Sequence, residues 1–130
     1  LFTNIKKEGG CKYIHLIKDG DIVHNLNNFK ITINLIKNIK NLRNASISCL
    51  EPKTKTIIHN KFDKYLYRAH IPLYIPNKHS GICVEKECRT WKVNDFLLVD
   101  ESLMHQVWNN STKCRVILLL DVIKVKFKGN

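Results

Sequence analysis

Histidine and arginine side chains stand at the ends of apolar, strand-like runs in the second half of this 130-residue chain. Arg68 and His70 share one such run, His105 opens another, and Arg115 begins the most apolar run in the sequence. Plain alternation of apolar and polar residues does not require these side chains. Imidazole binds metal ions, and guanidinium binds a carboxylate at two points. A β-protein that carries both is a candidate metal enzyme with a carboxylate co-substrate.

Three of the six histidines are candidate ligands, namely His59, His70 and His105. His59 follows one predicted strand, and His105 opens a later one. In a β-barrel such strand ends can meet at one mouth, where two imidazoles form a site suited to Fe(II), Zn or Cu. We interpret the other histidines, which lie in an early strand, a loop and a turn, as incidental: His15, His24 and His79.

Short β-strands must position these residues. After residue 44, apolar runs recur about 8–12 residues apart, which is the spacing of a sandwich or barrel. Strands are predicted at residues 13–17, 46–50, 54–58, 65–75, 81–84, 89–93, 96–99, 105–109 and 115–126. The apolar pattern of residues 28–41 fits both a strand and a helix, and we predict a helix there. The polar residues 1–10 are predicted as a frayed terminus. The predicted fold class is mainly β, a jelly roll of two sheets with a short helical N-terminal part.

Length and composition limit the number of domains and the kinds of partner that this chain can have. Length and the lack of repeats or linkers predict one domain, residues 1–130. The net charge of +11 admits a nucleic acid or an anionic surface as partner. The lysines, however, are spread along a chain rich in Asn and Ile, without a basic block interleaved with aromatics, so we expect no nucleic-acid partner. No apolar run approaches about 18 residues, which predicts no membrane segment in this chain. The oligomeric state does not follow from the sequence.

The chain has five cysteines and no C-x-x-C spacing, which argues against a zinc site or a complete disulfide framework. Cys83 and Cys88 are close enough in sequence to bridge across a short hairpin in an oxidising compartment. A reduced, buried role fits the same two residues.

An ordered set of motifs spans this chain from about residue 13 to residue 122, most clearly from residue 46 onward. It consists of residues 47–54 with His59, residues 66–73, residues 89–91, residues 99–108 and Arg115. In order and spacing the set resembles the aspartyl/asparaginyl β-hydroxylase family. The resemblance implies a double-stranded β-helix, that is, a cupin-like jelly roll. It also implies an Fe(II)- and 2-oxoglutarate-dependent dioxygenase that uses O₂ to hydroxylate the β-carbon of Asp or Asn in a protein substrate.

The same resemblance implies the site residues. His59 and His105 would be the catalytic metal ligands and hold Fe(II). Arg115, with Ser48, would hold the distal carboxylate of 2-oxoglutarate.

Arg68 and His70 would hold the other end of the co-substrate, near the metal. A dicarboxylate is best held by a cation at each end, and Arg68 and Arg115 fit that requirement.

Lys61 is the informative departure. Most two-histidine oxygenases carry an acid two residues after the first histidine, and this chain has Lys61 there. The β-hydroxylase branch characteristically lacks that acid, but a lysine so close to Fe(II) would weaken binding unless its stem reaches solvent. The alternative hypothesis is therefore a non-catalytic jelly-roll binding module that has kept the family frame. The resemblance leaves the endoplasmic reticulum and the cytoplasm both open as compartments.

Overall fold

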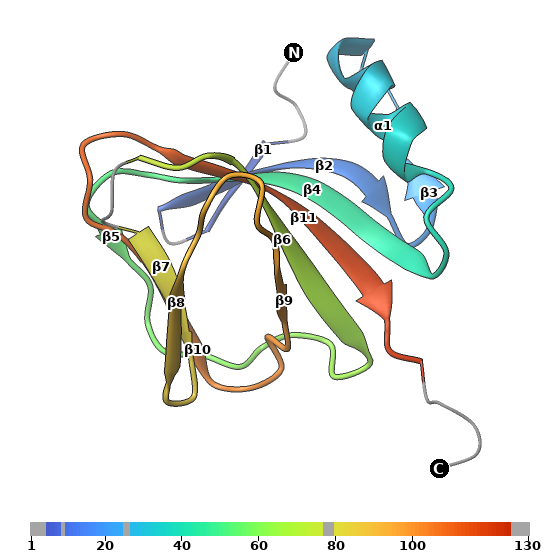
Figure 1. Cartoon of the computed structure of the whole chain (residues 1–130). Coiled ribbons are helices and arrows are strands. Elements are labelled where there is room, and N and C mark those ends of the chain that lie inside the picture. The colour runs from blue at the N-terminus through green and yellow to red at the C-terminus, as the bar shows by residue number, and fades with distance from the viewer. Residues whose placement is uncertain (1–4, 9, 25–26, 77–79, 126–130) are drawn as a thin grey trace.

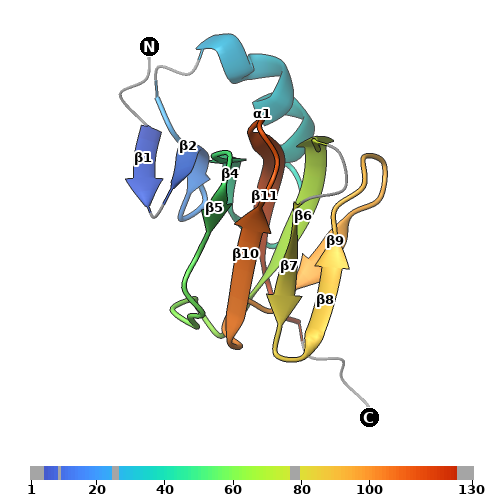
Figure 2. The same ribbon diagram turned by 90° about the vertical axis from the view of Figure 1, so that its left-hand side faces the viewer.

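The computed structural model describes residues 5–8, 10–24, 27–76 and 80–125, and its strands form two antiparallel sheets (Figures 1 and 2). The larger sheet has the order β1-β2-β4-β11-β6-β9, with β3 paired to β2. Its strands are β1 (Ile5–Glu8), β2 (Cys11–Lys18), β3 (Asp21–Ile22), β4 (Leu42–Leu50), β6 (Leu66–Tyr74), β9 (Leu97–Val99) and β11 (Arg115–Ile123). The smaller sheet, in the order β5-β10-β7-β8, contains β5 (Thr54–Lys55), β7 (Ser80–Val84), β8 (Glu87–Thr90) and β10 (His105–Asn109). The predicted mainly-β jelly roll is confirmed.

Strand β11 lies at the centre of the larger sheet and divides the core in two. It pairs with β4 on one side and β6 on the other, which explains why its sequence is apolar on both faces. Ile117 and Leu119 point inward and pack with Ile82 of β7 between the sheets. Leu118 and Leu120 point outward. Arg115 has the same parity as the inward residues, so the strand carries its guanidinium into the space between the sheets.

The outer face of the larger sheet is covered by helix α1 (Lys30–Ile36), which is preceded by a 3-10 turn, η1 (Asn27–Phe29). Ile33 and Ile36 pack against Leu118 and Leu120. None of the helices in the described part of the chain is long and apolar enough to cross a membrane.

Several predicted element boundaries are wrong: the strand predicted for residues 46–50 begins at Leu42, for example, and the strand predicted for residues 89–93 ends at Thr90. The helix predicted for residues 28–41 ends at Ile36, because the chain then turns and Asn41, at φ 65°, redirects it into β4. The strand predicted for residues 54–58 ends at Lys55. The predicted frayed terminus contains β1, a backbone pairing that its polar sequence does not reveal. The predicted turn histidine, His79, lies outside the described residues.

Cys83 and Cys88 form a disulfide across the β7–β8 hairpin, where they are direct register partners. Of the two roles left open by the sequence, the structure therefore has the bridged one.

Candidate active site

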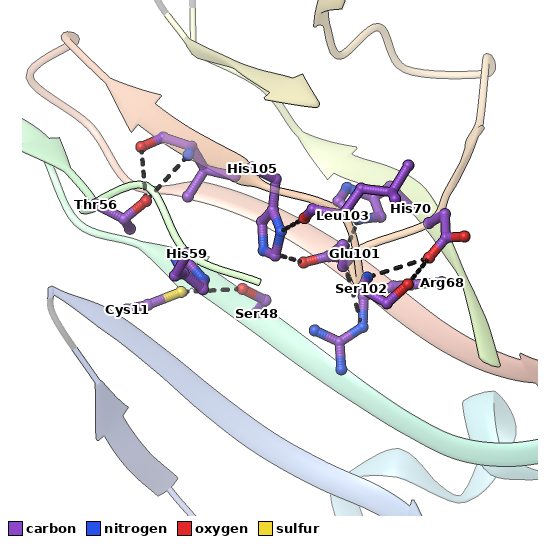
Figure 3. A network of polar contacts seen from close by, with 12 residues as sticks. Cys11, Ser48, Thr56, His59, Arg68, His70, Glu101, Ser102, Leu103 and His105 are labelled. Carbon is purple, nitrogen blue, oxygen red and sulfur yellow. Dashed lines mark hydrogen bonds and ion pairs between the residues drawn. The ribbon is translucent and has the colours of Figure 1, made fainter. Parts of the chain in front are cut away.

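His59 and His105 lie opposite each other at the edge of the smaller sheet. Each donates its backbone N–H to the carbonyl of the other, at 3.0 and 2.8 Å, which forms an isolated antiparallel bridge. Directly opposed residues of an antiparallel pair project from the same face. The two imidazoles are therefore side by side, with ring centroids 4.3 Å apart (Figure 3). The backbone thus brings together two histidines that are 46 positions apart in the sequence.

Both rings are oriented by the same local contact. Nδ1 of His59 donates to the carbonyl of Ile57 at 2.7 Å, and Nδ1 of His105 donates to the carbonyl of Leu103 at 2.8 Å. In a neutral ring this places the proton on Nδ1 and leaves the lone pair on Nε2. Metal-ligating histidines are usually held in this way. The pair therefore fits a role as two nitrogen ligands of a metal such as Fe(II).

A buried carboxylate lies beside this pair. Glu101 Oε1 is 3.2 Å from His105 Nε2, and Oε2 is 2.8 Å from His70 Nε2 (Figure 3). Trp91 donates its indole N–H to His70 Nδ1 at 3.1 Å, so the proton of His70 is on Nε2 and is donated to Glu101. Glu101 therefore joins His70 of the larger sheet to His105 of the smaller one.

The charges in this cluster shift its titrations. Burial alone would raise the pKa of Glu101, but hydrogen bonds from His105 and His70 and the charge of Arg68 hold it well below its usual range. Burial would lower the pKa of His105, yet its hydrogen bonds to Glu101 and the Leu103 carbonyl raise it. Burial keeps the pKa of His70 below its ordinary value, so that ring is neutral near pH 7.

Arg68 is paired with two acids. Its Nε and Nη2 donate to the two oxygens of Asp121 at 2.7 and 3.1 Å, and its Nε is 3.6 Å from Glu101 Oε2. Asn44 also donates to Asp121, at 3.1 Å. The guanidinium stacks on the ring of Phe62. Burial opposes the charge of Arg68, but the hydrogen bond to Asp121 and the negative charges of Glu101 and Asp121 together outweigh it and raise the pKa.

Arg115 is in the opposite situation. Its side chain is only 2% exposed, and Nη2 donates to the hydroxyl of Ser48 at 2.7 Å. Its Nε is buried without a hydrogen-bond partner, and no ion pair is formed by it among the residues that the structure describes. Its guanidinium lies over the Trp91 ring, and burial lowers its pKa. A buried cation without an anion is costly, and a bound carboxylate would satisfy it.

The structure thus gathers all six predicted site residues between the two sheets. His59 and His105 adjoin each other, Arg115 adjoins Ser48, and Arg68 and His70 both reach Glu101. Their predicted roles stay predictions.

Sequence reasoning missed three participants: Glu101, Asp121 and Trp91. Trp91 lies in the motif at residues 89–91, and Glu101 lies in the motif at residues 99–108. The position of Glu101, an acid four residues before His105, was a usable signal. Lys61 is exposed, so its ammonium group reaches solvent and is not buried beside the histidines.

No three His, Cys, Asp or Glu side chains among the described residues converge on one point as they stand. Two surface hollows open elsewhere, one beside Arg89 and Trp108 and the other beside Lys53 and Tyr74. Neither includes the histidine pair.

Solved structures of similar fold place the molecule in a class. An oxidoreductase of the 2OG-Fe(II) oxygenase family from Burkholderia pseudomallei matches with a TM-score of 0.70 at 12% identity, over 92% of this chain and 71% of its own. A cupin 2 conserved barrel domain protein from Salinispora arenicola matches with a TM-score of 0.59 at 12% identity, over 93% and 82%. The fold is that of the cupin-like jelly rolls.

Residues 4–125 match the model of the aspartyl/asparaginyl beta-hydroxylase family, and the chain belongs to that family. The mouse aspartyl/asparaginyl beta-hydroxylase is 32% identical over 58% of this chain and 10% of its own length. An ornithine lipid ester-linked acyl 2-hydroxylase from Rhizobium tropici is 29% identical over 68% of this chain and 32% of its own. The chain thus spans between a tenth and a third of these relatives, which are hydroxylases.

Proposed function

We propose that this protein is an Fe(II)- and 2-oxoglutarate-dependent hydroxylase that acts on the β-carbon of Asp or Asn in a protein substrate. The observation that carries the proposal is Arg115, a buried guanidinium with a hydroxyl partner and no acid partner among the residues that the structure describes. It stands on the inner face of the larger sheet, and the histidine pair stands on the smaller sheet. A dicarboxylate co-substrate and a metal need such a combination of groups.

His59 and His105 would hold Fe(II) through their Nε2 atoms, because each Nδ1 is bound to a backbone carbonyl. When bound, the metal supplies the activation of O₂, while the protein binds, orients and excludes water. The overall reaction converts 2-oxoglutarate, O₂ and a C–H bond into succinate, CO₂ and a C–OH bond.

Arg115 and Ser48 would bind the distal carboxylate of 2-oxoglutarate. Nη2 already points to the Ser48 hydroxyl, and Nε is a second donor with nothing to bind. In this buried position a charge-assisted pair is strong, because little water competes with it. Arg68 and His70 border the metal end and hold Glu101 there. Their predicted direct contact with the co-substrate would have to compete with those bonds.

A second substrate class is favoured by the rim of the site. The two residues that precede each histidine are apolar and exposed: Ile57, Ile58, Leu103 and Met104, at 80%, 59%, 44% and 41%. Such a rim suits an acyl chain, the kind of group named in the Rhizobium relative. The same assay separates the two classes, since an Asp- or Asn-containing peptide and an acyl lipid can be offered in parallel.

Succinate release tests the proposal. Purified protein is incubated with Fe(II), ascorbate, O₂ and 2-oxoglutarate, and binding of Mn(II) and 2-oxoglutarate is measured by calorimetry. We expect metal-dependent succinate formation that is lost in His59→Ala and in His105→Ala. His24→Ala, which alters an exposed histidine, is the matched control and should retain it. Absence of both metal and 2-oxoglutarate binding in the unaltered protein would end the proposal.

The non-catalytic binding module predicts a different result. It is favoured by the engagement of Arg68 with Asp121 and Glu101, which occupies one of the two predicted co-substrate cations. Under that alternative neither His59→Ala nor His105→Ala changes any metal response, and no succinate forms with either substrate class.

A further inference from the structure

Cys11 lies beside the predicted anchor of the distal carboxylate. In β2 it pairs with Leu50 of β4, and Leu50 pairs on its other side with Arg115 of β11. Directly opposed residues project from the same face of a sheet, so the thiol shares the inter-sheet face with the guanidinium. Cys11 is 5% exposed, and its Sγ is 3.3 Å from Ser48 Oγ (Figure 3). Ser48 Oγ also accepts Arg115 Nη2 at 2.7 Å, so the thiol and the guanidinium meet at one hydroxyl.

The Ser48 hydroxyl is shared between these two neighbours. A hydroxyl has one proton and two lone pairs, and Arg115 occupies one of the lone pairs. The other side-chain contact of Ser48 in the described part of the chain is the Cys11 sulfur, and either atom of that pair can donate. Donation by Ser48 satisfies its buried proton, whereas donation by Cys11 leaves that proton without an acceptor. Without a bound anion, Ser48 therefore donates to Cys11.

The sulfur of Cys11 is a weak partner for this proton, because thiols are poor hydrogen-bond donors and acceptors. Tyr13, two positions further along β2 and therefore on the same face, also forms a hydrogen bond with the thiol. Burial, followed by the Cys11 side chain, raises the pKa of Tyr13, which keeps its phenol protonated and able to donate to the sulfur. The sulfur therefore keeps a donor when the Ser48 hydroxyl turns elsewhere.

Arg115 gives an independent sign that an anion belongs at this place. Its Nε is buried without a hydrogen-bond partner, and the residue is 2% exposed. A carboxylate that binds this guanidinium comes within reach of Ser48, because Nη2 already holds that hydroxyl. A hydrogen bond from a hydroxyl to a carboxylate is charge-assisted and about twice as strong as a neutral one. The carboxylate therefore replaces the weaker sulfur as the acceptor of the Ser48 hydroxyl.

We propose that Cys11 is a positioning residue for the distal carboxylate of the co-substrate. Without the carboxylate, its sulfur accepts the hydroxyl of Ser48. With the carboxylate bound, Ser48 turns its O–H to that group, and Cys11 donates its S–H to the second lone pair of Ser48. The change rotates two hydrogens about the C–O and C–S bonds and breaks no covalent bond. The inference rests on the proposed function, in which Arg115 binds 2-oxoglutarate.

The S–H stretching band tests this reversal directly. The band lies in a region of the infrared and Raman spectra without other protein bands, and it moves to lower frequency when the thiol becomes a donor. The free thiols in the described part of the chain are Cys11, Cys49 and Cys114, and the Cys11 band is the one lost in Cys11→Ser. We expect it to move to lower frequency when 2-oxoglutarate is added to the Mn(II)-loaded protein. The probe 2-oxobutanoate, which has the same 2-oxo acid group and lacks the distal carboxylate, should not move it.

Calorimetry with the same two ligands measures what the contact contributes to binding. Cys11→Ala should weaken 2-oxoglutarate binding about fivefold, as expected for one hydrogen bond, and should leave 2-oxobutanoate binding unchanged. Cys11→Ser should retain the affinity, because its hydroxyl accepts and donates as the thiol does. Cys49→Ala, next to Ser48 in the sequence and on the opposite face of β4, is the matched control and should bind both ligands like the unaltered protein.

Two results overturn the inference. The first is that no S–H band of the unaltered protein moves while 2-oxoglutarate binds, which decides the matter whether or not the variants fold. The second is an equal loss for the two ligands in Cys11→Ala, because a thiol needed only for the fold or for the metal would weaken both. Failure of the unaltered protein to bind 2-oxoglutarate would instead contradict the proposed function.

Discussion

Arg68 and Arg115 enter the same space between the sheets and differ in what neutralises them. Arg68 has a two-point ion pair with Asp121 and a second acid, Glu101, nearby. Arg115 has one hydroxyl, one aromatic face and a buried Nε without a partner. Their sequence settings are alike, since each stands in an apolar strand. Only the strand register tells them apart, because β6 places Arg68 opposite Asp121 and β4 places a leucine opposite Arg115.

The difference separates a structural charge from a functional one. A buried charge that is paired with an opposite charge has a structural role, because removing either member of the pair leaves the other buried without a counter-charge. A buried charge without a partner stabilises the folded state no better than a hydrophobic side chain would. Such a charge is therefore retained for a ligand. The two arginines should therefore respond to the same substitution with opposite signs.

Arg68→Met should have the largest effect on stability. It leaves Asp121 and Glu101 buried with one cation fewer, and breaking such a pair costs about 3–5 kcal/mol. Urea unfolding measures the loss. Arg43→Met removes an exposed arginine beside Asp19 and should cost less than about 1 kcal/mol. If both variants lose equally little, the pairing of Arg68 with Asp121 and Glu101 does not stabilise the fold.

Arg115→Met should leave the free energy of unfolding unchanged or raise it, because methionine fills similar space without a buried charge. The same change should weaken 2-oxoglutarate binding by about 100-fold, equivalent to about 2.7 kcal/mol. Calorimetry with Mn(II) present measures the affinity, and unfolding measures the stability. A variant that unfolds easily and still binds 2-oxoglutarate would reverse the assignment of the two arginines.

Ser48→Ala should have a smaller effect of the same kind. It removes the acceptor of Arg115 Nη2, and a hydrogen bond to a charged group contributes about 1.5 kcal/mol, or about tenfold in affinity. In the Arg115→Met background the substitution should no longer change the affinity, because the two residues act through one contact. Additive losses in the double variant would show that Ser48 acts independently of Arg115.

Most of the strands could be predicted from the sequence, because burial leaves a direct pattern in them. The predicted strand at residues 105–109 has those bounds in the structure, and the apolar run after Arg115 is the central strand β11. The predicted helix was too long because the apolar positions Ile39 and Leu42 continue the helical spacing past Ile36, yet Ile39 is 40% exposed and Leu42 begins strand β4. Periodicity shows where apolar residues recur and does not show which of them another layer covers.

The residues of the site were named from motifs, but their partners were not. Arg68 and Asp121 are 53 positions apart, and only the register of β6 on β11 makes them neighbours. Glu101 stands in a quoted motif beside His105, and its contact with His70 depends on the packing of the two sheets. The sequence therefore predicted which groups gather and could not predict how their charges are matched.

Acid should reduce the stability that the pairing of Arg68 with its two acids provides. This loss in the free energy of unfolding should be smaller than the effects of the substitutions above. The folded pKa of Glu101 lies well below its ordinary value, so its ionised form contributes stability that is complete above the unfolded pKa. That contribution is lost as the pH falls through the folded pKa, from roughly pH 5 downward. With a chelator present, the free energy of unfolding should therefore fall with pH in this range, and Glu101→Gln should flatten the slope. Arg115→Met, which has no carboxylate partner to lose, should keep the slope of the unaltered protein; an equal change in both variants would mean that the two arginines share one set of charges.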